Sequence, residues 1–338
     1  MKSEKCFIIA EIAQAHEGSL GMLHSYIDAV AKTGVDAIKF QTHIAEAESS
    51  EFEPFRVKLK YQQDATRFDY WKRMQFNQNE WQEIKDHCDE VGLEFMSSPF
   101  SIAAVEILEA VGMKKYKIAS GEVTNYLMLD RIARIGKPIL VSSGMSSFKD
   151  VEGAINFLKP FNSDISIFQC TTSYPVKAEE LGLNVLSELY ERFKVPVGLS
   201  DHSGTIYPSL AAVTMGASLL EVHTIFNKEM FGLDAKASVT IDELSKLVEG
   251  VRYIETAMAN PVKKDDNEKY TELKRIFGKS LSVRRDMLQG ETITIDDLET
   301  KKPEGYGISP KQFADIIGKR LRIDKIKNSF LKFEDLEI

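Results

Sequence analysis

Amino and hydroxyl side chains follow several short apolar runs of this sequence. Lys39 lies in Ile38-Lys-Phe-Gln41, Lys117 lies in Tyr116-Lys-Ile118, and serines close several other runs. Ammonium and hydroxyl groups are donors that bind phosphate and carboxylate anions. The residues that we expect to bind such an anion are Lys39, Ser98, Lys117, Ser120, Ser142 and Ser200. In the alternative interpretation, each lysine only pairs with a neighbouring carboxylate.

Two histidines, His202 and His223, end two consecutive apolar runs. If those runs are neighbouring strands, the two imidazoles lie side by side. Neutral imidazoles with open positions suit a divalent metal, and Mn²⁺ or Mg²⁺ held partly by water and substrate fits better than structural zinc. The alternative is that each histidine is an ordinary buried polar residue.

Glu11 ends the first apolar run. Its functional interpretation is a general acid/base or a ligand of sugar hydroxyls. The alternative is that Glu11 only pairs with Lys39.

Cys6, Cys88 and Cys170 are widely spaced in apolar or helical contexts, and we interpret them as reduced core thiols.

Eight short apolar runs alternate with eight helical patterns, which predicts a (β/α)8 TIM barrel of about 250 residues. The expected strands are 7–11, 37–41, 94–98, 116–120, 139–143, 166–171, 195–200 and 219–224. The expected helices are 20–33, 79–91, 101–112, 125–135, 148–159, 184–193, 207–216 and 241–258. A doubly wound sheet is the rival, but the sequence has no GxGxxG turn. Parallel strands of a barrel end at one rim, so the polar residues above should form one site.

Three further segments complete the domain prediction of a barrel over 1–258, a linker and a tail domain. Residues 44–78 form a long, aromatic connection that we expect to fold over the barrel mouth. Residues 259–272 are polar and are predicted to be the linker. Within 273–338, Gly278-Lys-Ser-Leu281 and Gly318-Lys-Arg-Leu321 begin two similar arms, which predicts a small pseudo-symmetric β-rich domain.

Composition excludes several classes of protein. The 338 residues are 43% hydrophobic and 28% charged, which is typical of a globular protein and not of a coiled coil, collagen or disordered chain. A net charge of −8 argues against nucleic acid as the main partner. No apolar run is long enough to span a membrane, and no signal peptide is evident, so we expect a cytoplasmic location.

The motifs taken together resemble the sialic acid synthase family, and the tail resembles the antifreeze-like (SAF) domain that closes its members. The matching segments are Phe7–Ser19, Ile38–His43, Ser97–Phe100, Tyr116–Glu122, Ser143–Met145, Cys170–Pro175, Gly198–His202 and Glu221–His223. The resemblance implies a condensation of phosphoenolpyruvate with an N-acyl hexosamine, with N-acetylmannosamine as the first expectation. Legionaminate or pseudaminate synthesis from a 2,4-diacetamido-6-deoxy hexose is the alternative within the family.

The resemblance also assigns residues. Phosphoenolpyruvate would be bound by the lysines and serines named above together with Gln41 and Thr172. His202 and His223 would hold the metal, which polarises the open-chain sugar aldehyde. Glu11, Tyr174 and Asp234 would surround the sugar. The family works as a dimer whose tails exchange barrels, so we expect a domain-swapped homodimer in which Lys302 reaches the partner's sugar.

Three departures from the family pattern fall on the sugar side. Ala235 replaces a histidine, and Lys302 replaces an arginine before Pro303. The family's asparagine in the long connection is absent, with Gln62 or Gln63 nearest. The Ala235 and Lys302 departures are the support for a second function, a sugar-binding homologue without turnover. A further alternative, from a different enzyme class, is a metal-dependent aldolase that releases no phosphate.

Overall fold

The computed structural model describes residues 5–57, 60–161 and 164–337. The chain forms two compact units, one ending at Asn260 and one beginning at Pro261. Each unit is described by itself. Within the described residues, no helix is both long and apolar enough to cross a membrane.

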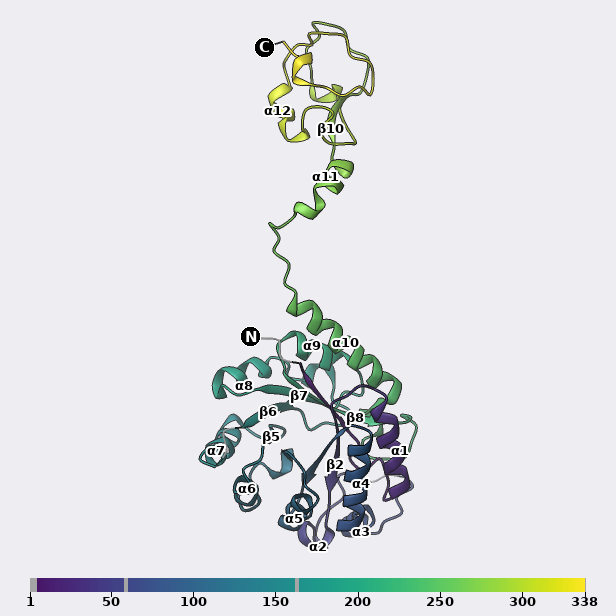
Figure 1. Ribbon diagram of the computed structural model, residues 1–338, viewed down its shortest axis with the longest axis vertical. Coiled ribbons are helices and arrows are strands. Elements are labelled where there is room, and N and C mark those ends of the chain that lie inside the picture. Colours follow the sequence, from purple (N-terminus) through teal and green to yellow (C-terminus); the bar gives the residue numbers. More distant parts are fainter. Residues whose placement is uncertain (1–4, 58–59, 162–163, 338) are drawn as a thin grey trace. The chain divides into compact units, whose positions relative to one another are not determined.

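The first unit is a closed barrel of eight parallel strands, which confirms the predicted fold (Figure 1). Each strand pairs with the next, and β1 also pairs with β8, so the sheet closes. The strands are β1 (Phe7–Glu11), β2 (Ala37–Thr42), β3 (Glu94–Pro99), β4 (Tyr116–Ile118), β5 (Ile139–Ser142), β6 (Ile165–Cys170), β7 (Val197–Asp201) and β8 (Leu219–Ile225). In register, Glu11 lies opposite Lys39 on one side and His223 on the other.

The outer helices each begin and end within two residues of the expected bounds. They are α1 (Leu20–Ala31), α4 (Gln78–Glu90), α5 (Ile102–Ala110), α6 (Tyr126–Ala133), α7 (Phe148–Leu158), α8 (Val185–Phe193), α9 (Tyr207–Thr214) and α10 (Ile241–Ala259). Side-chain caps begin most of them, and α4, α7 and α10 each have a full capping box. Their apolar faces pack on the strands to form the main core.

The barrel interior is layered because alternate residues of a strand point to the same side. An apolar layer contains Ile9, Ala37, Met96, Leu140 and Phe168. Two residues further along the same strands lie Glu11, Lys39, Ser98, Ser142 and Cys170. Apolar packing therefore supports a polar layer at the carboxyl ends of the strands.

The long connection after β2 is partly helical. It contains α2 (Ala45–Glu48) and α3 (Arg67–Met74). Buried Tyr70, Trp71 and Met74 form a small core that also contacts Leu233 from the segment after β8. Not all aromatic side chains of this connection are packed, because Phe52 is 84% exposed.

The second unit contains an antiparallel pair, β10 (Ser280–Val283) and β11 (Leu298–Lys301), around its own small core. Its repeat is visible in the backbone. The amide of Arg284 donates to Asp297 and the amide of Arg322 donates to Asp335, both at 2.8 Å. The predicted linker 259–272 contains a short 3-10 turn, Glu268–Tyr270, and the start of α11 (Thr271–Phe277). The unit also contains α12 (Phe313–Ile316).

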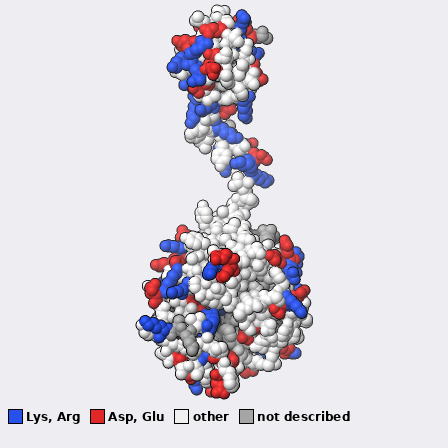
Figure 2. Space-filling model, turned by 180° about the vertical axis from the view of Figure 1, so that it is seen from behind, with Lys and Arg blue, Asp and Glu red and all other residues white. Residues whose placement is uncertain are grey.

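Acidic and basic side chains are interspersed over the face of the barrel shown in Figure 2.

The three cysteines are free and buried, as the sequence predicts.

Candidate active site

A buried group of two lysines and two glutamates lies at the carboxyl ends of the strands. Lys117 Nζ lies 2.8 and 2.9 Å from the two carboxylate oxygens of Glu221. Lys39 Nζ lies 2.6 Å from Glu11 Oε2 and 3.7 Å from Glu221 Oε1. All four side chains are at most 5% exposed. The group is balanced in charge, and we call it the lysine–glutamate group.

The two glutamates of this group differ in acidity. Burial raises the pKa of Glu11 to about 7, with Lys39 opposing the rise and Glu221 adding to it. Burial also acts to raise the pKa of Glu221, but Lys117 and Lys39 outweigh it and hold that pKa at about 2. Burial acts to lower the pKa of Lys39, yet both carboxylates together raise it. Glu221 is therefore a stable anion at neutral pH, whereas Glu11 can exchange a proton there.

Glu221 is the acceptor that sequence reasoning missed. The pairing of each lysine with a carboxylate, the alternative interpretation of the sequence, is present in the structure, because Glu221 contacts both lysines. A signal was present in the sequence. Glu221 lies two residues before His223 on the same strand, so strand alternation puts both side chains on the inner face.

Three polar residues named from the sequence join the lysine–glutamate group. Lys39 Nζ donates to Ser98 Oγ at 3.3 Å, and Ser200 Oγ donates to Glu221 Oε1 at 3.2 Å. Gln41 Nε2 donates to Glu11 Oε1 at 3.0 Å. These bonds fix the orientation of both carboxylates.

The remaining donors lie after β4, β5 and β6. A Cβ atom on Gly144 would lie 2.4 Å from both Ser120 Oγ and Thr172 Oγ1, so a glycine lets this loop pack against both hydroxyls. Thr172 Oγ1 is a buried hydroxyl without a hydrogen-bond partner among the described residues. Ser142 is buried at the end of β5. Ser120 does not extend β4 as expected, because the strand ends at Ile118 and Ser120 begins a 3-10 turn.

His202 and His223 lie side by side, with ring centroids 5.1 Å apart. Burial lowers the pKa of each imidazole to about 3, and each also lies near other basic groups. Both are therefore neutral near pH 7. His202 Nδ1 lies 2.8 Å from the Thr171 carbonyl oxygen, which places a proton on Nδ1 and leaves the Nε2 lone pair free.

This pair fits a divalent metal that takes its other ligands from water and substrate. Within residues 5–57, 60–161 and 164–337, no three His, Cys, Asp or Glu side chains converge as a metal cluster. Asp234 Oδ2 lies 3.9 Å from His223 Nδ1, near the pair without being a formed ligand.

An aromatic and charged rim surrounds the histidines. The Tyr174 ring stacks on His202 with centroids 4.1 Å apart and lies edge-on to His223 at 5.7 Å. The guanidinium of Arg56, from the long connection, lies over the Tyr174 ring at 4.4 Å from its centroid. Its Nη2 donates to Asp234 Oδ1 at 3.0 Å. No sequence pattern points to Arg56, which is a lone arginine in an irregular segment.

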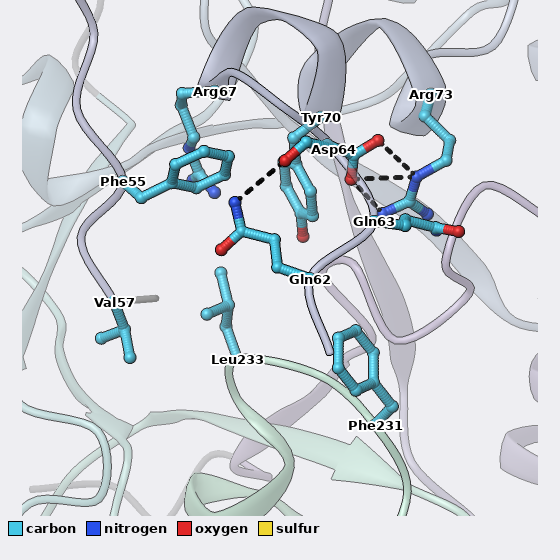
Figure 3. A pocket seen from close by; sticks show the side chains of 10 residues that line it. All are labelled: Phe55, Val57, Gln62, Gln63, Asp64, Arg67, Tyr70, Arg73, Phe231 and Leu233. Atoms are coloured by element: carbon cyan, nitrogen blue, oxygen red, sulfur yellow. Dashed lines mark hydrogen bonds and ion pairs between the residues drawn. The ribbon is translucent and has the colours of Figure 1, made fainter. Parts of the chain in front are cut away.

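A small pocket lies behind this rim, between the long connection and the segment after β8 (Figure 3). Gln62 Nε2 donates to the Asp64 carbonyl oxygen at 3.2 Å, and Arg73 forms paired hydrogen bonds with the Asp64 carboxylate. The apolar walls are Phe55, Val57, Phe231 and Leu233. Gln62 and Gln63, the nearest equivalents of the family asparagine, both line this pocket.

Two other departures have distinct surroundings. Ala235 is buried at 5% exposure, where a larger histidine would have to displace its neighbours. Lys302 belongs to the second unit, where its Nζ lies 4.8 Å from the centre of the Phe277 ring.

Comparison with known proteins identifies the family. The model of the NeuB family matches residues 26–263, and the model of the SAF domain matches residues 278–337. The chain belongs to the NeuB family. The resemblance and the tail domain that the sequence motifs indicate are thereby confirmed.

Relatives of this NeuB-family chain have three different names. N,N'-diacetyllegionaminic acid synthase of Legionella pneumophila is 32% identical over 348 residues, covering 99% of this chain and 96% of that protein. Human N-acetylneuraminate-9-phosphate synthase is 32% identical over 331 residues, covering 94% of this chain and 89% of that protein. Pseudaminic acid synthase of Helicobacter pylori is 30% identical over 335 residues, covering 98% of this chain and 97% of that protein.

A solved structure agrees with this assignment. The N-acetylneuraminic acid synthetase of Leptospira borgpetersenii, in complex with citrate, matches with a TM-score of 0.71 and 26% identity. The match covers 80% of this chain and 92% of that one. The comparisons therefore show the family and the fold and leave the sugar open.

Proposed function

We propose that this chain condenses phosphoenolpyruvate with an open-chain N-acyl hexosamine, forming a nine-carbon 3-deoxy-2-keto acid and releasing phosphate. The observation that carries the proposal is the lysine–glutamate group beside two neutral histidines in a NeuB-family barrel. The two lysines supply fixed positive charges for an anion, and the two histidines supply nitrogen lone pairs for a metal.

Phosphoenolpyruvate is the anion that we assign to the inner layer. Lys39 and Lys117 carry the positive charge, and contacts with Glu221 hold both ammonium groups in place. The unpaired Thr172 hydroxyl supports a further contact, because buried polar groups are normally satisfied. Further hydroxyl donors in this proposal are Ser98, Ser120, Ser142 and Ser200.

Glu11 is the residue to which we assign proton transfer. Its raised pKa, about 7, lets the carboxyl be protonated or ionised near neutral pH. In the reaction, C3 of phosphoenolpyruvate bonds to C1 of the sugar, and the former aldehyde oxygen takes up a proton. Water then adds at C2, loses a proton to a base, and the C2–O bond to phosphate breaks.

His202 and His223 are the residues that we assign to a bound Mn²⁺ or Mg²⁺. When bound, such an ion polarises the aldehyde of the sugar. Tyr174 covers one face of His202 and thereby limits access of water to that imidazole. Asp234, held by Arg56, is the acceptor that we assign to sugar hydroxyls.

N-acetylmannosamine is the sugar that we propose first. A 2,4-diacetamido-6-deoxy hexose is the second candidate, favoured by the Legionella relative that matches this chain almost end to end. The test incubates purified protein and Mn²⁺ with phosphoenolpyruvate and each sugar separately, and measures phosphate and keto acid. Stoichiometric formation of both with one sugar supports the proposal. A parallel incubation uses pyruvate in place of phosphoenolpyruvate, and keto acid formed from pyruvate alone indicates an aldolase. Sugar binding without product from either three-carbon substrate indicates a binding protein.

We further propose a domain-swapped homodimer in which Lys302 reaches the sugar of the partner barrel. The support is the SAF domain, its 14 Lys and Arg against 11 Asp and Glu over residues 273–338, and the polar segment that precedes it. Dimers that exchange a segment are symmetric, so both crossings are equivalent.

Complementation tests the exchange. A Glu11→Gln chain is mixed with a Lys302→Ala chain and allowed to exchange subunits. In a swapped mixed dimer, the intact barrel of the second chain meets the intact tail of the first, so one of its two sites is complete. About half of the dimers are mixed under random pairing, so activity should return to about a quarter of wild type. If each tail serves its own barrel, every site keeps one lesion and no activity returns. A fully active Lys302→Ala protein would instead contradict the assignment of Lys302.

A further inference from the structure

A second group of histidines lies on the outside of the barrel, between α1 and α4 (Figure 1). His24 and Asp28 are one helical turn apart on α1, and Glu83 and His87 are one turn apart on α4. The two Nδ1 atoms, of His24 and His87, lie only 2.8 Å apart. The group is independent of the site described above.

Each imidazole has a carboxylate of the opposite helix at its other nitrogen. His87 Nε2 lies 3.2 Å from Asp28 Oδ1, within hydrogen-bond distance. His24 Nε2 lies 3.2 Å from Glu83 Oε1, a charge contact that is not an aligned hydrogen bond. Asp28 accepts from His87 Nε2, which leaves a lone pair on Nδ1 of His87. The charge contact of Glu83 with His24 Nε2 is compatible with the same tautomer of His24. This is the outer-shell arrangement found around metal-binding histidines, which donate one ring N–H to a carboxylate and bind through the other nitrogen.

The consequence lies at the two facing Nδ1 atoms. When each ring carries its proton on Nε2, both Nδ1 atoms present a lone pair, 2.8 Å apart. Two such lone pairs repel at that separation. The repulsion is removed when one Nδ1 carries a proton and donates it to the other, or when both bind a metal ion that lies to one side of the line between them. Adjacent ligands on an ion with bonds of about 2.1 Å are about 3 Å apart, close to the spacing observed here.

We propose that His24 and His87 bind a divalent transition-metal ion of the Ni²⁺, Cu²⁺ and Zn²⁺ class through their Nδ1 atoms. Imidazole nitrogen is a ligand suited to these ions. The rings are 23% and 20% exposed, so an ion can reach them from solvent. The described residues hold no cluster of three such ligands, so water completes the coordination of this two-nitrogen site.

The surroundings of the pair favour a cation. A hollow beside the two rings is lined by Asn79, Gln82, Glu83, Asp86 and Glu90, which supply oxygen atoms and negative charge. A bound ion would join α1 to α4. Because α1 follows β1 and α4 precedes β3, it would tie together two parts of the barrel and stabilise the folded state.

Ni²⁺ titration of untagged protein tests the site. The starting protein carries His202→Ala and His223→Ala, so that the histidines of the proposed catalytic metal do not contribute. Calorimetry should show one Ni²⁺ per chain. Either His24→Asn or His87→Asn should weaken binding at least 10-fold, and Asp28→Asn or Glu83→Gln about 10-fold, as for an outer-shell carboxylate. The matched control is Gln82→Ala, which lines the same hollow without contacting either ring and should change the affinity less than 2-fold.

Electron paramagnetic resonance with Cu²⁺ identifies the ligands. Two equivalent nitrogen couplings are expected in the starting protein, and one after His24→Asn. Circular dichroism of each variant checks that the surface substitutions leave the fold intact. The proposal is overturned if no saturable binding occurs, in which case the pair holds only a proton. It is equally overturned if binding is unchanged in both His24→Asn and His87→Asn.

Discussion

The inner layer and the rim of the site are built in different ways. The inner layer consists of side chains on strands, at most 5% exposed, with partners on neighbouring strands. The rim comes from irregular segments, and Arg56 is 45% exposed. Gln62 and Gln63, the nearest equivalents of the family asparagine, line a pocket formed by these irregular segments. We therefore propose that the reaction class depends on the barrel and that sugar choice depends on the connections.

The proposed metal ligands, His202 and His223, contact the rim through Tyr174, and loss of the metal should have the largest effect. Chelation should abolish turnover, and Mn²⁺ or Mg²⁺ should restore it, because polarisation of the aldehyde supplies much of the transition-state stabilisation. His202→Ala and His223→Ala should each lose most activity while remaining folded. Phosphate release measures activity, and thermal unfolding checks the fold. Full activity of either variant after exhaustive chelation would contradict the assignment.

Glu11→Gln, a substitution in the inner layer, should give the next largest effect. The amide keeps the size of the side chain but cannot exchange the proton, so kcat should fall by roughly 10²–10⁴-fold. Affinity for phosphoenolpyruvate, measured by calorimetry, should change little because Lys39 and Lys117 remain. If the affinity falls and kcat at saturation does not, Glu11 acts only as the partner of Lys39.

Lys117→Met tests the stability of the inner layer. Removing one member of a buried ion pair leaves Glu221 short of a partner and should lower the free energy of unfolding by about 3–5 kcal/mol. The matched control is Lys115→Met, which breaks a more exposed pair with Glu94 and should cost about 1 kcal/mol or less. Urea denaturation measures both. Equal effects would show that the buried pair contributes no more than a surface pair.

Arg56→Ala tests the rim and should have the smallest effect. Loss of its charged hydrogen bond to Asp234 should raise KM for the sugar about 10-fold, with kcat and KM for phosphoenolpyruvate nearly unchanged. Arg56→Lys should not restore KM, because lysine cannot both stack on Tyr174 and present a planar fork. Arg131→Ala, of similar exposure on α6, is the control. A parallel loss of phosphoenolpyruvate affinity would mean that rim and inner layer are not separate.

The comparison also separates what could be predicted. The barrel was predictable because strand and helix periods alternate clearly. The position of Lys39, Lys117 and His202 at the carboxyl ends of the strands follows from parallel strands ending together. Glu221 was missed although its strand position gave a signal. Arg56 had no such signal, because it lies in an irregular segment. A segment without a regular period does not indicate in which direction a side chain points.

The sequence by itself determined the order of the elements, the alternation along each strand and the family to which the motifs belong. Only the tertiary structure decided that Glu221 lies between two lysines and that Arg56 reaches Asp234 across 178 residues of chain. The physical reason is that periodicity is a local property, set by backbone geometry within a few residues. Ion pairs and pKa values depend on distances between residues that are remote in the chain, and folding alone fixes those distances.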